Sequence, residues 1–340
     1  MRAWLLDQFG GIGALRLAET ADPVAQAGEV VLEIHYAALN PADRYLAEKQ
    51  YPAKPRLPHI LGRDGVGTVL ALGPGVTGVS VGDHRVILRG EVGADRPGTF
   101  AERVVVPVES LAEVPAAWDE MEAAAAPLVY LTAYQALSMW GDLPTSSVVL
   151  VTGASGGVGV ASVQLAVALG HTVVALSRSE DKRTRLRQLG ASLCLDPGEA
   201  GWRLSLKNAV APRRVELAID NIGGTLLPEV IDTLGNNGKV SLVGRLAGPV
   251  PSFNTATLFF RRIRIGGVAV GAYAPVESQA AWKSVLSLLA RTGARPVVDS
   301  VLPFDRLPEA FACLAAGPMG KVLLAAPGTQ IRTTIRTTIR

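Results

Sequence analysis

Apolar residues alternate with polar ones, or form short runs, over roughly the first 115 positions. Residues 30–36, 66–72, 86–88 and 102–106 have the pattern of strands that bury one or both faces. Between them lie turn signals such as Gly73-Pro74-Gly75. The pattern predicts a compact unit made mainly of β-strands.

The pattern changes near residue 119. Residues 121–139, rich in alanine and leucine, predict a helix, and beyond them strand-like and helix-like segments alternate. The predicted strands are 148–152, 172–177, 193–195, 215–219, 239–243 and 263–268, and the predicted helices are 157–169, 180–189, 200–210 and 224–234. Such alternation predicts a parallel sheet with helices on both faces.

The last part of the chain returns toward the first pattern. Residues 277–291 predict an amphipathic helix, and residues 296–326 predict strand, helix and strand, the last of which can pair with the N-terminal strands. We therefore expect an α/β chain with a domain formed by residues 1–118 and 294–327 and a second domain of residues 119–293. Residues 328–340 repeat a four-residue unit and are expected to form a disordered tail.

Composition narrows the class of protein. A chain of 340 residues, 49% hydrophobic and 19% charged, is typical of a globular protein with two domains. The net charge of +3 equals the charge of Arg332, Arg336 and Arg340 in the tail, so no nucleic-acid partner is expected. The two cysteines are far apart, no signal-peptide pattern precedes Asp7, and no long uncharged apolar stretch occurs. We expect a cytoplasmic protein without membrane segments.

Residues 148–159 predict a nucleotide site. Four apolar residues lead into a glycine-rich turn with glycines at 153, 156 and 159, and an apolar helix follows. Ala154 makes this a variant of the G-x-G-x-x-G pattern, whose glycines let backbone N–H groups approach a pyrophosphate. A glycine-rich turn without a ligand is the alternative. The residues expected to contact the cofactor are Gly153, Ala154, Ser155, Gly156, Gly157, Val158 and Gly159.

The end of the next predicted strand indicates which nicotinamide cofactor binds. An acid at this position accepts hydrogen bonds from the adenosine ribose of NAD, whereas here Ser177 is followed by Arg178 and, one turn later, by Lys182. A hydroxyl and two cations suit a 2′-phosphate, so NADPH is expected. The alternative is that the two cations are solvated and that Glu180 and Asp181 weaken their field.

Together these segments identify a family by resemblance. The chain resembles the medium-chain dehydrogenase/reductase superfamily, within it the zinc-free quinone oxidoreductase branch, over about residues 1–326. The matching segments are 39–43, 61–69, 81–86, 98–102, 131–137, the glycine turn, 220–224 and 320–322. The resemblance implies a GroES-like β domain built from both chain ends, a Rossmann domain, a small-molecule substrate, and a homodimer that pairs strands near 263–268.

The same resemblance predicts that no metal is bound. Zinc members of the superfamily take catalytic ligands from positions that Asn40 and Arg63 occupy here, and neither side chain is a good zinc ligand. No cysteine precedes Cys194, and the four histidines lack the spacing of a metal motif. Arg63 and Asp64 could fill the region electrostatically or bind an acidic substrate, and the sequence leaves both open.

The resemblance also implies the reaction, which is hydride transfer from NADPH to a quinone or an α,β-unsaturated carbonyl compound. Asn40 is expected beside the substrate as a donor, and Tyr51 stands where enoyl-thioester reductases carry a proposed proton donor. The alternatives are that Asn40 is a turn residue before Pro41 and that Tyr51 is a loop residue that packs on Pro52. A 2-enoyl thioester reductase and a non-catalytic nicotinamide sensor remain alternatives. Further residues expected to contact the cofactor by resemblance are Thr132, Asn221, Gly244 and Lys321.

Overall fold

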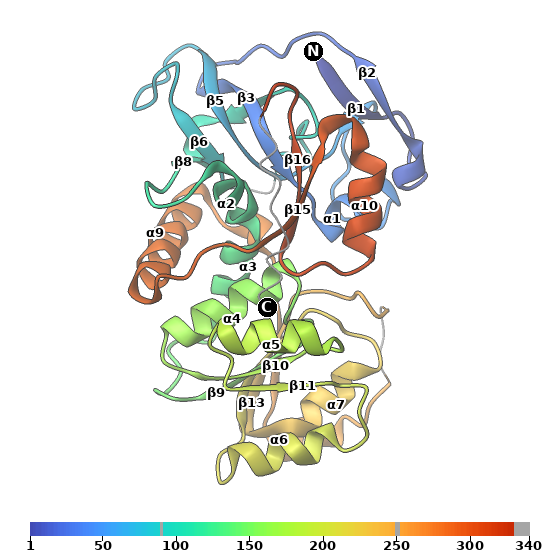
Figure 1. Cartoon of the computed structure of the whole chain (residues 1–340), viewed down its shortest axis with the longest axis vertical. Helices are drawn as coiled ribbons and strands as arrows, with labels where there is room; N and C mark the ends of the chain where they lie inside the picture. The colour runs from blue at the N-terminus through green and yellow to red at the C-terminus, as the bar shows by residue number, and fades with distance from the viewer. Residues whose placement is uncertain (89–90, 249–251, 330–340) are drawn as a thin grey trace. The chain divides into compact units, whose positions relative to one another are not determined.

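The computed structural model describes residues 1–88, 91–248 and 252–329, and the predicted tail lies largely outside this part of the chain. Two compact units are distinguished (Figure 1). The first comprises residues 1–128, 271–282 and 295–340, and the second comprises residues 129–270 and 283–294. The sequence-based boundaries put residues 119–128 and 271–282 in the nucleotide domain. By contacts they group with the first unit, where the Trp118 and Trp282 rings lie 5.9 Å apart.

The first unit is built on two sheets. The larger has the order β15-β16-β3-β5-β6-β8, with β7 also paired to β3, and the smaller has the order β2-β1-β4. The strands are β1 (Arg2–Leu6), β2 (Leu15–Glu19), β3 (Glu29–Ala38), β4 (His59–Ile60), β5 (Asp64–Leu72), β6 (His84–Ile87), β7 (Arg103–Pro107), β8 (Leu111–Glu113), β15 (Val298–Pro303) and β16 (Lys321–Ala325).

The C-terminal return takes place in this larger sheet. β16 pairs antiparallel with β3, with Leu323 opposite Ala38 and Ala325 opposite Tyr36. The two strands lie side by side in Figure 1 although they come from opposite ends of the chain. This pairing confirms the predicted closure of the last strand onto the N-terminal strands. The pairing satisfies backbone N–H and C=O groups that an unpaired strand would leave exposed.

Helices complete the first unit. They are α1 (Pro41–Ala47), α2 (Glu120–Ala125), α10 (Leu307–Ala315) and the first part of α9 (Pro275–Thr292). The pattern analysis missed α1, which is short and begins at a proline. The helix predicted over 121–139 is two helices, α2 and α3 (Pro127–Ser138), because Pro127 lacks an N–H and restricts the residue before it.

The second unit contains a six-stranded sheet in the order β11-β10-β9-β12-β13-β14, and every neighbouring pair is parallel. Its elements are β9 (Val148–Val151), α4 (Gly157–Ala168), β10 (Thr172–Leu176), α5 (Glu180–Gln188), β11 (Leu193–Leu195), α6 (Trp202–Val210), β12 (Val215–Asp220), α7 (Leu226–Thr233), β13 (Leu234–Leu242), α8 (Ala256–Phe260) and β14 (Arg264–Gly267). Counted from β9, this is the 3-2-1-4-5-6 order of a Rossmann sheet.

The two units have separate cores. In the first, Leu6, Leu32, Leu46 and Phe100 are completely or almost completely buried. In the second, all of β9 and residues 173–176 of β10 are apolar and buried, because helices cover both faces of a parallel sheet, whereas β12 carries Glu216 and Asp220 among its apolar residues. Over the described ranges, we find no helix with the length and hydropathy that a membrane span requires.

Candidate functional site

The glycine turn of the second unit joins β9 to the N-terminus of α4. Gly153 has φ of 55°, and a Cβ on Gly159 would lie 2.2 Å from the Gly153 carbonyl oxygen. Gly156 is the N-cap of α4 with an extended backbone and no side-chain cap. The turn is therefore too tight for side chains at two of its positions, and the first N–H groups of the helix are open to an anion.

The ends of β9, β12 and β13 meet beside this turn. Asn221 donates from Nδ2 to the Thr152 carbonyl oxygen at 2.8 Å, and a Cβ on Gly244 would lie 2.7 Å from the Asn221 carbonyl oxygen. The neighbouring Asp220 accepts from the Thr152 hydroxyl at 2.6 Å. Burial raises the pKa of Asp220, and its hydrogen bonds, led by that of Thr152, oppose the shift.

Asn221 also supplies a fit test for a cofactor. Its side chain is buried, and its Oδ1 has no hydrogen-bond partner among the described residues. A buried acceptor without a partner is costly, so such an atom points to a missing donor. A Rossmann sheet binds its ligand where the strand order reverses, here between β9 and β12, which is where Asn221 lies. The residues at the carboxyl ends of β9 and β12 therefore fit a dinucleotide.

The end of β10 carries the residues predicted to select the cofactor. Ser177 is buried, Arg178 is exposed, and Lys182 lies in the first turn of α5. The sequence analysis did not single out Arg183, which is buried and donates from Nη1 to the Ser177 carbonyl oxygen at 2.8 Å. Arg183 also pairs with Glu180 at 2.6 Å, so one of the two acids expected to weaken the local field is compensated. The sequence signal for this ion pair is the spacing of three residues between Glu180 and Arg183, which places both side chains on one face of a helix.

Asn40 is the centre of a buried polar cluster in the first unit. It is the N-cap of α1, and its side chain contacts residues that are distant in sequence. Lys321 donates from Nζ to Asn40 Oδ1 at 2.6 Å and to Asp64 Oδ2 at 3.1 Å. Asn40 Nδ2 donates to the same Asp64 oxygen at 2.9 Å and to the Ala38 carbonyl oxygen at 3.3 Å. The structure thus brings together three residues that the sequence analysis named separately.

A second polar group is formed by the buried Arg63 and Asp43 and the partly buried Tyr51. Arg63 donates from Nη1 to the Tyr51 hydroxyl at 2.8 Å, and its guanidinium carbon lies 4.1 Å from the centre of the Tyr51 ring. Arg63 Nε lies 3.8 Å from Asp43 Oδ1. Burial raises the pKa of Asp43 to about 6, against the opposing effect of Arg63. Asp43 also accepts from the Asn40 backbone N–H at 2.8 Å, which fixes the first turn of α1.

The predicted site residues are divided between the two units. Thr132 is a buried residue of α3 in the second unit. The Asn40 cluster and Tyr51 belong to the first unit, and the glycine turn, Ser177, Asn221 and Gly244 belong to the second.

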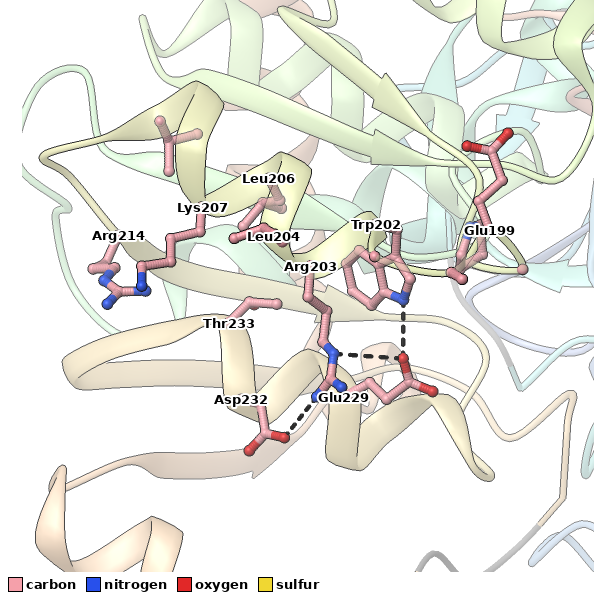
Figure 2. A pocket seen from close by; sticks show the side chains of 15 residues that line it. Glu199, Trp202, Arg203, Leu204, Leu206, Lys207, Arg214, Glu229, Asp232 and Thr233 are labelled. Carbon is pink, nitrogen blue, oxygen red and sulfur yellow. Dashed lines mark hydrogen bonds and ion pairs between the residues drawn. The ribbon is translucent and has the colours of Figure 1, made fainter.

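A hollow of about 690 Å³ lies along α6 and α7 in the second unit (Figure 2). Several polar side chains that line it pair with each other. Trp202 Nε1 donates to Glu229 at 2.9 Å, and Arg203 donates to Asp232 at 2.9 Å. It contains none of the residues that the sequence analysis selected. We do not assign the cofactor to it.

Comparison with known proteins agrees with both units. Residues 26–116 match the alcohol dehydrogenase GroES-like domain, and residues 157–291 match the zinc-binding dehydrogenase family model. A crystal structure of an NAD-dependent alcohol dehydrogenase is 30% identical, with a TM-score of 0.87 and coverage of 96% of this chain and 99% of that one. The chain belongs to the medium-chain dehydrogenase/reductase superfamily.

Within the superfamily the chain is similar to quinone oxidoreductases. The quinone oxidoreductase of Lama guanicoe is 29% identical over 327 residues, which cover 95% of this chain and 97% of that protein. A mycobacterial protein whose structure was solved with NADPH is 27% identical, with a TM-score of 0.86 and coverage of 96% of this chain and 100% of that one. The fold and family expected from the sequence are confirmed, namely a GroES-like unit and a Rossmann-like unit.

Proposed function

We propose that the protein is an NADPH-dependent, zinc-independent oxidoreductase that transfers a hydride to a quinone or an α,β-unsaturated carbonyl compound. The family is that of oxidoreductases, and curated relatives that align over nearly the whole chain are named quinone oxidoreductases. The observation that carries the zinc-independent part of the proposal is the buried Lys321 ammonium between Asn40 and Asp64.

Support for NADPH comes from the relative solved with it and from the residues after β10. The backbone N–H groups of the glycine turn would hold the pyrophosphate, and Ser177, Arg178 and Lys182 would surround the 2′-phosphate. Asn221 Oδ1 would accept a hydrogen bond that no described residue supplies. Bound NADPH supplies the hydride at nicotinamide C4.

The argument against a catalytic zinc rests on the chemistry of the Asn40 cluster. Asn40 Oδ1 and Asp64 Oδ2 both accept from Lys321, and Asp64 Oδ1 accepts from the Leu128 backbone N–H at 3.0 Å. A divalent cation would have to displace a buried ammonium to reach these oxygens. Zinc also prefers thiolate, imidazole or carboxylate ligands, and the cluster offers one carboxylate.

Asn40 would orient the substrate carbonyl in this proposal. Of its two amide hydrogens, one is held firmly by Asp64 Oδ2 at 2.9 Å, while the contact to the Ala38 carbonyl oxygen is long at 3.3 Å. The second hydrogen is therefore the one that would be donated to a substrate oxygen. Lys321 and Asp64 would position the amide for this contact.

A second candidate function, reduction of 2-enoyl thioesters, is favoured by the surroundings of Tyr51. Its hydroxyl oxygen accepts from Arg63 at 2.8 Å, which leaves the phenolic hydrogen to donate elsewhere. In this reaction the hydride would reach the β-carbon and the Tyr51 hydroxyl would protonate the α-carbon.

The test is a panel of acceptors with the purified full-length protein. Stopped-flow oxidation of NADPH is followed with quinones, enones and a 2-enoyl thioester, before and after treatment with a chelator, with metal content measured in parallel. We expect quinone or enone turnover that survives metal removal. Loss of turnover that zinc restores, at a temperature at which the metal-free protein is still folded, would contradict the proposal, and binding of NADPH without oxidation by any acceptor would favour a sensor.

Tyr51→Phe separates the two catalytic candidates. If Tyr51 is the proton donor, the variant loses enoyl thioester reduction and keeps quinone reduction, because quinone reduction does not require an acid at that position. If both activities are unchanged, Tyr51 only packs against Arg63.

We further infer a homodimer that pairs the edge strands of two Rossmann sheets. β14 (Arg264–Gly267) is the last strand in the sheet order, so one side of its backbone lacks a strand partner within the described sheet. Strand edges favour pairing with a second chain. Light scattering coupled to size exclusion tests this, and Ile265→Pro, which removes one N–H of the strand, should shift a dimer toward monomer.

A further inference from the structure

Two histidines and one glutamate meet in the first unit, although their spacing in the sequence shows no metal motif. His35 lies on β3, His84 begins β6, and Glu120 begins α2. His35 Nδ1 lies 2.8 Å from Glu120 Oε1, and His84 Nδ1 lies 2.7 Å from the same oxygen. The two imidazole rings are edge to face with centres 5.5 Å apart. The tertiary structure alone creates this cluster.

The cluster has the donor set of a transition-metal site. One ligand atom from each residue can be chosen so that all three lie within 4.8 Å of one another. Zinc binds imidazole nitrogen and carboxylate oxygen at about 2.0–2.2 Å, so tetrahedral neighbours of a zinc ion are about 3.3 Å apart. The present nitrogen–oxygen distances of 2.8 and 2.7 Å would open by about half an ångström, which is within the range of rotamer adjustments.

We propose that His35 Nδ1, His84 Nδ1 and Glu120 Oε1 bind a divalent transition-metal ion such as Zn²⁺, with a fourth position left for water. Two imidazoles and one carboxylate favour zinc and its neighbours over magnesium or calcium, which prefer oxygen ligands. This site shares no residue with the Asn40 cluster, so it would be distinct from the proposed hydride-transfer site and would leave the proposed zinc-independent chemistry unchanged.

The surroundings of His35 support the assignment. Its Nε2 lies 3.1 Å from the Thr68 hydroxyl on β5. When Nδ1 binds a metal, Nε2 carries the ring proton and donates it, and a hydroxyl can accept as readily as it donates. Metal-binding histidines usually have such a partner on the second nitrogen, because it fixes the ring orientation and tautomer.

Charge at the cluster also favours a cation. The Glu120 carboxylate brings its negative charge close to both imidazoles, at 2.8 Å from His35 Nδ1 and 2.7 Å from His84 Nδ1. The side chains of His35 and Glu120 are 22% and 30% exposed, and that of His84 is 54% exposed, so an ion could enter from solvent and retain a water ligand.

Metal binding would link three elements of the first unit, namely β3, β6 and α2. β3 and β6 both pair with β5, and α2 follows them by more than thirty residues in the chain. An ion bound only by the folded chain stabilises it in proportion to the logarithm of its concentration above the dissociation constant. We therefore expect the unit's thermal stability to depend on zinc.

The experiment uses tag-free, full-length protein stripped with a chelator. Isothermal titration with Zn²⁺ alone measures stoichiometry and affinity, and Co²⁺ absorption reports the ligand geometry. Thermal melts with and without Zn²⁺ give a second reading. The variants are His84→Ala, at an exposed position, and Glu120→Gln, which keeps the shape of the side chain. His171→Ala, in the second unit, is the matched control.

We expect the wild type and His171→Ala to bind one Zn²⁺ per chain and to melt at a higher temperature with it. His84→Ala and Glu120→Gln should each lose at least about tenfold in affinity, since loss of a direct ligand costs no less than loss of its supporting partner. NADPH turnover of both variants should equal that of the wild type. Failure of the wild type to bind stoichiometrically, or wild-type affinity in either variant, would overturn the proposal.

Discussion

The ammonium of Lys321 lies 2.6 Å from the side-chain oxygen of Asn40, although 281 positions separate the two residues. The same ammonium donates to the Leu39 carbonyl oxygen at 2.9 Å and to Asp64 at 3.1 Å, and its side chain is only 5% exposed. Three acceptors therefore saturate the three hydrogens of a buried lysine. This lysine binds the C-terminal strand β16 to the loop before α1.

Lys321→Met should destabilise the protein and misplace the Asn40 amide. Removal of one partner from a buried ion pair leaves the Asp64 carboxylate uncompensated, at a cost of about 3–5 kcal/mol. The free energy of unfolding by urea measures the loss, and kcat should fall with it. Lys283→Met, at an exposed position of α9, is the control and should change stability by less than about 0.5 kcal/mol. Equal stabilities of the two variants would contradict the structural role of Lys321.

Asp43 should make stability dependent on pH in the mildly acidic range. Its folded pKa of about 6 exceeds the ordinary aspartate value, so the folded state holds the proton more tightly than the unfolded chain. The stabilisation is complete below the unfolded value and is lost as the pH rises through 6, with a total of about 3 kcal/mol.

Asp43→Asn removes this dependence because the amide does not titrate. From pH 5 to pH 7 the wild type should lose about 1 kcal/mol relative to Asp43→Asn, measured as the difference between their free energies of unfolding at each pH. A difference that stays constant across this range would show that Asp43 titrates at its ordinary pKa.

The glycine turn offers a matched pair of substitutions. A Cβ on Gly159 would lie 2.2 Å from the Gly153 carbonyl oxygen, whereas the nearest atom to a Cβ on Gly156 is at 3.5 Å, an ordinary contact. Gly159→Ala must therefore shift the turn backbone and should weaken NADPH binding by more than tenfold, about 1.4 kcal/mol. Gly156→Ala should preserve the fold of the turn. Fluorescence titration with NADPH measures both, and similar affinity in Gly159→Ala and the wild type would refute the close approach.

The cofactor preference should depend on the residues after β10. Arg178→Ala removes an exposed cation, so it should raise the KM for NADPH by about tenfold or more while leaving the KM for NADH nearly unchanged. Arg185→Ala removes the same charge from an exposed position of α5 and is the control. Ser177→Asp should reverse the preference, because a carboxylate repels the 2′-phosphate and accepts from the ribose of NADH. A wild type that already prefers NADH would contradict the assignment.

Much of the second unit was predictable from the sequence because its signals are local. The runs that form β9, β10 and β12 are mostly apolar, and the glycines of the turn mark the helix start at Gly157. The parallel order follows from the regular alternation of strands and helices. Boundaries differ by a few residues, most clearly at β13, which begins at Leu234 rather than at 239.

The first unit was predictable only in outline. Short strands such as β8 and the helix α1 have too few residues for a clear period, and Pro127 divides a segment that appeared as one helix. The return of the last strand to the N-terminal strands was expected, but its pairing with β3 and the register, with Leu323 opposite Ala38, depend on side chains from both chain ends.

The sequence by itself determined the family, the nucleotide turn and the residues at the metal-ligand positions, because these are carried by contiguous motifs. Only the tertiary structure decided which residues act together. It placed Lys321 in hydrogen-bond contact with Asn40 and Asp64, and Arg183 in hydrogen-bond contact with the Ser177 carbonyl oxygen. It also brought His35 and His84 to the same carboxylate oxygen of Glu120. The physical reason is that buried polar groups must find partners, and chain topology, rather than sequence spacing, decides which partners lie within hydrogen-bond distance.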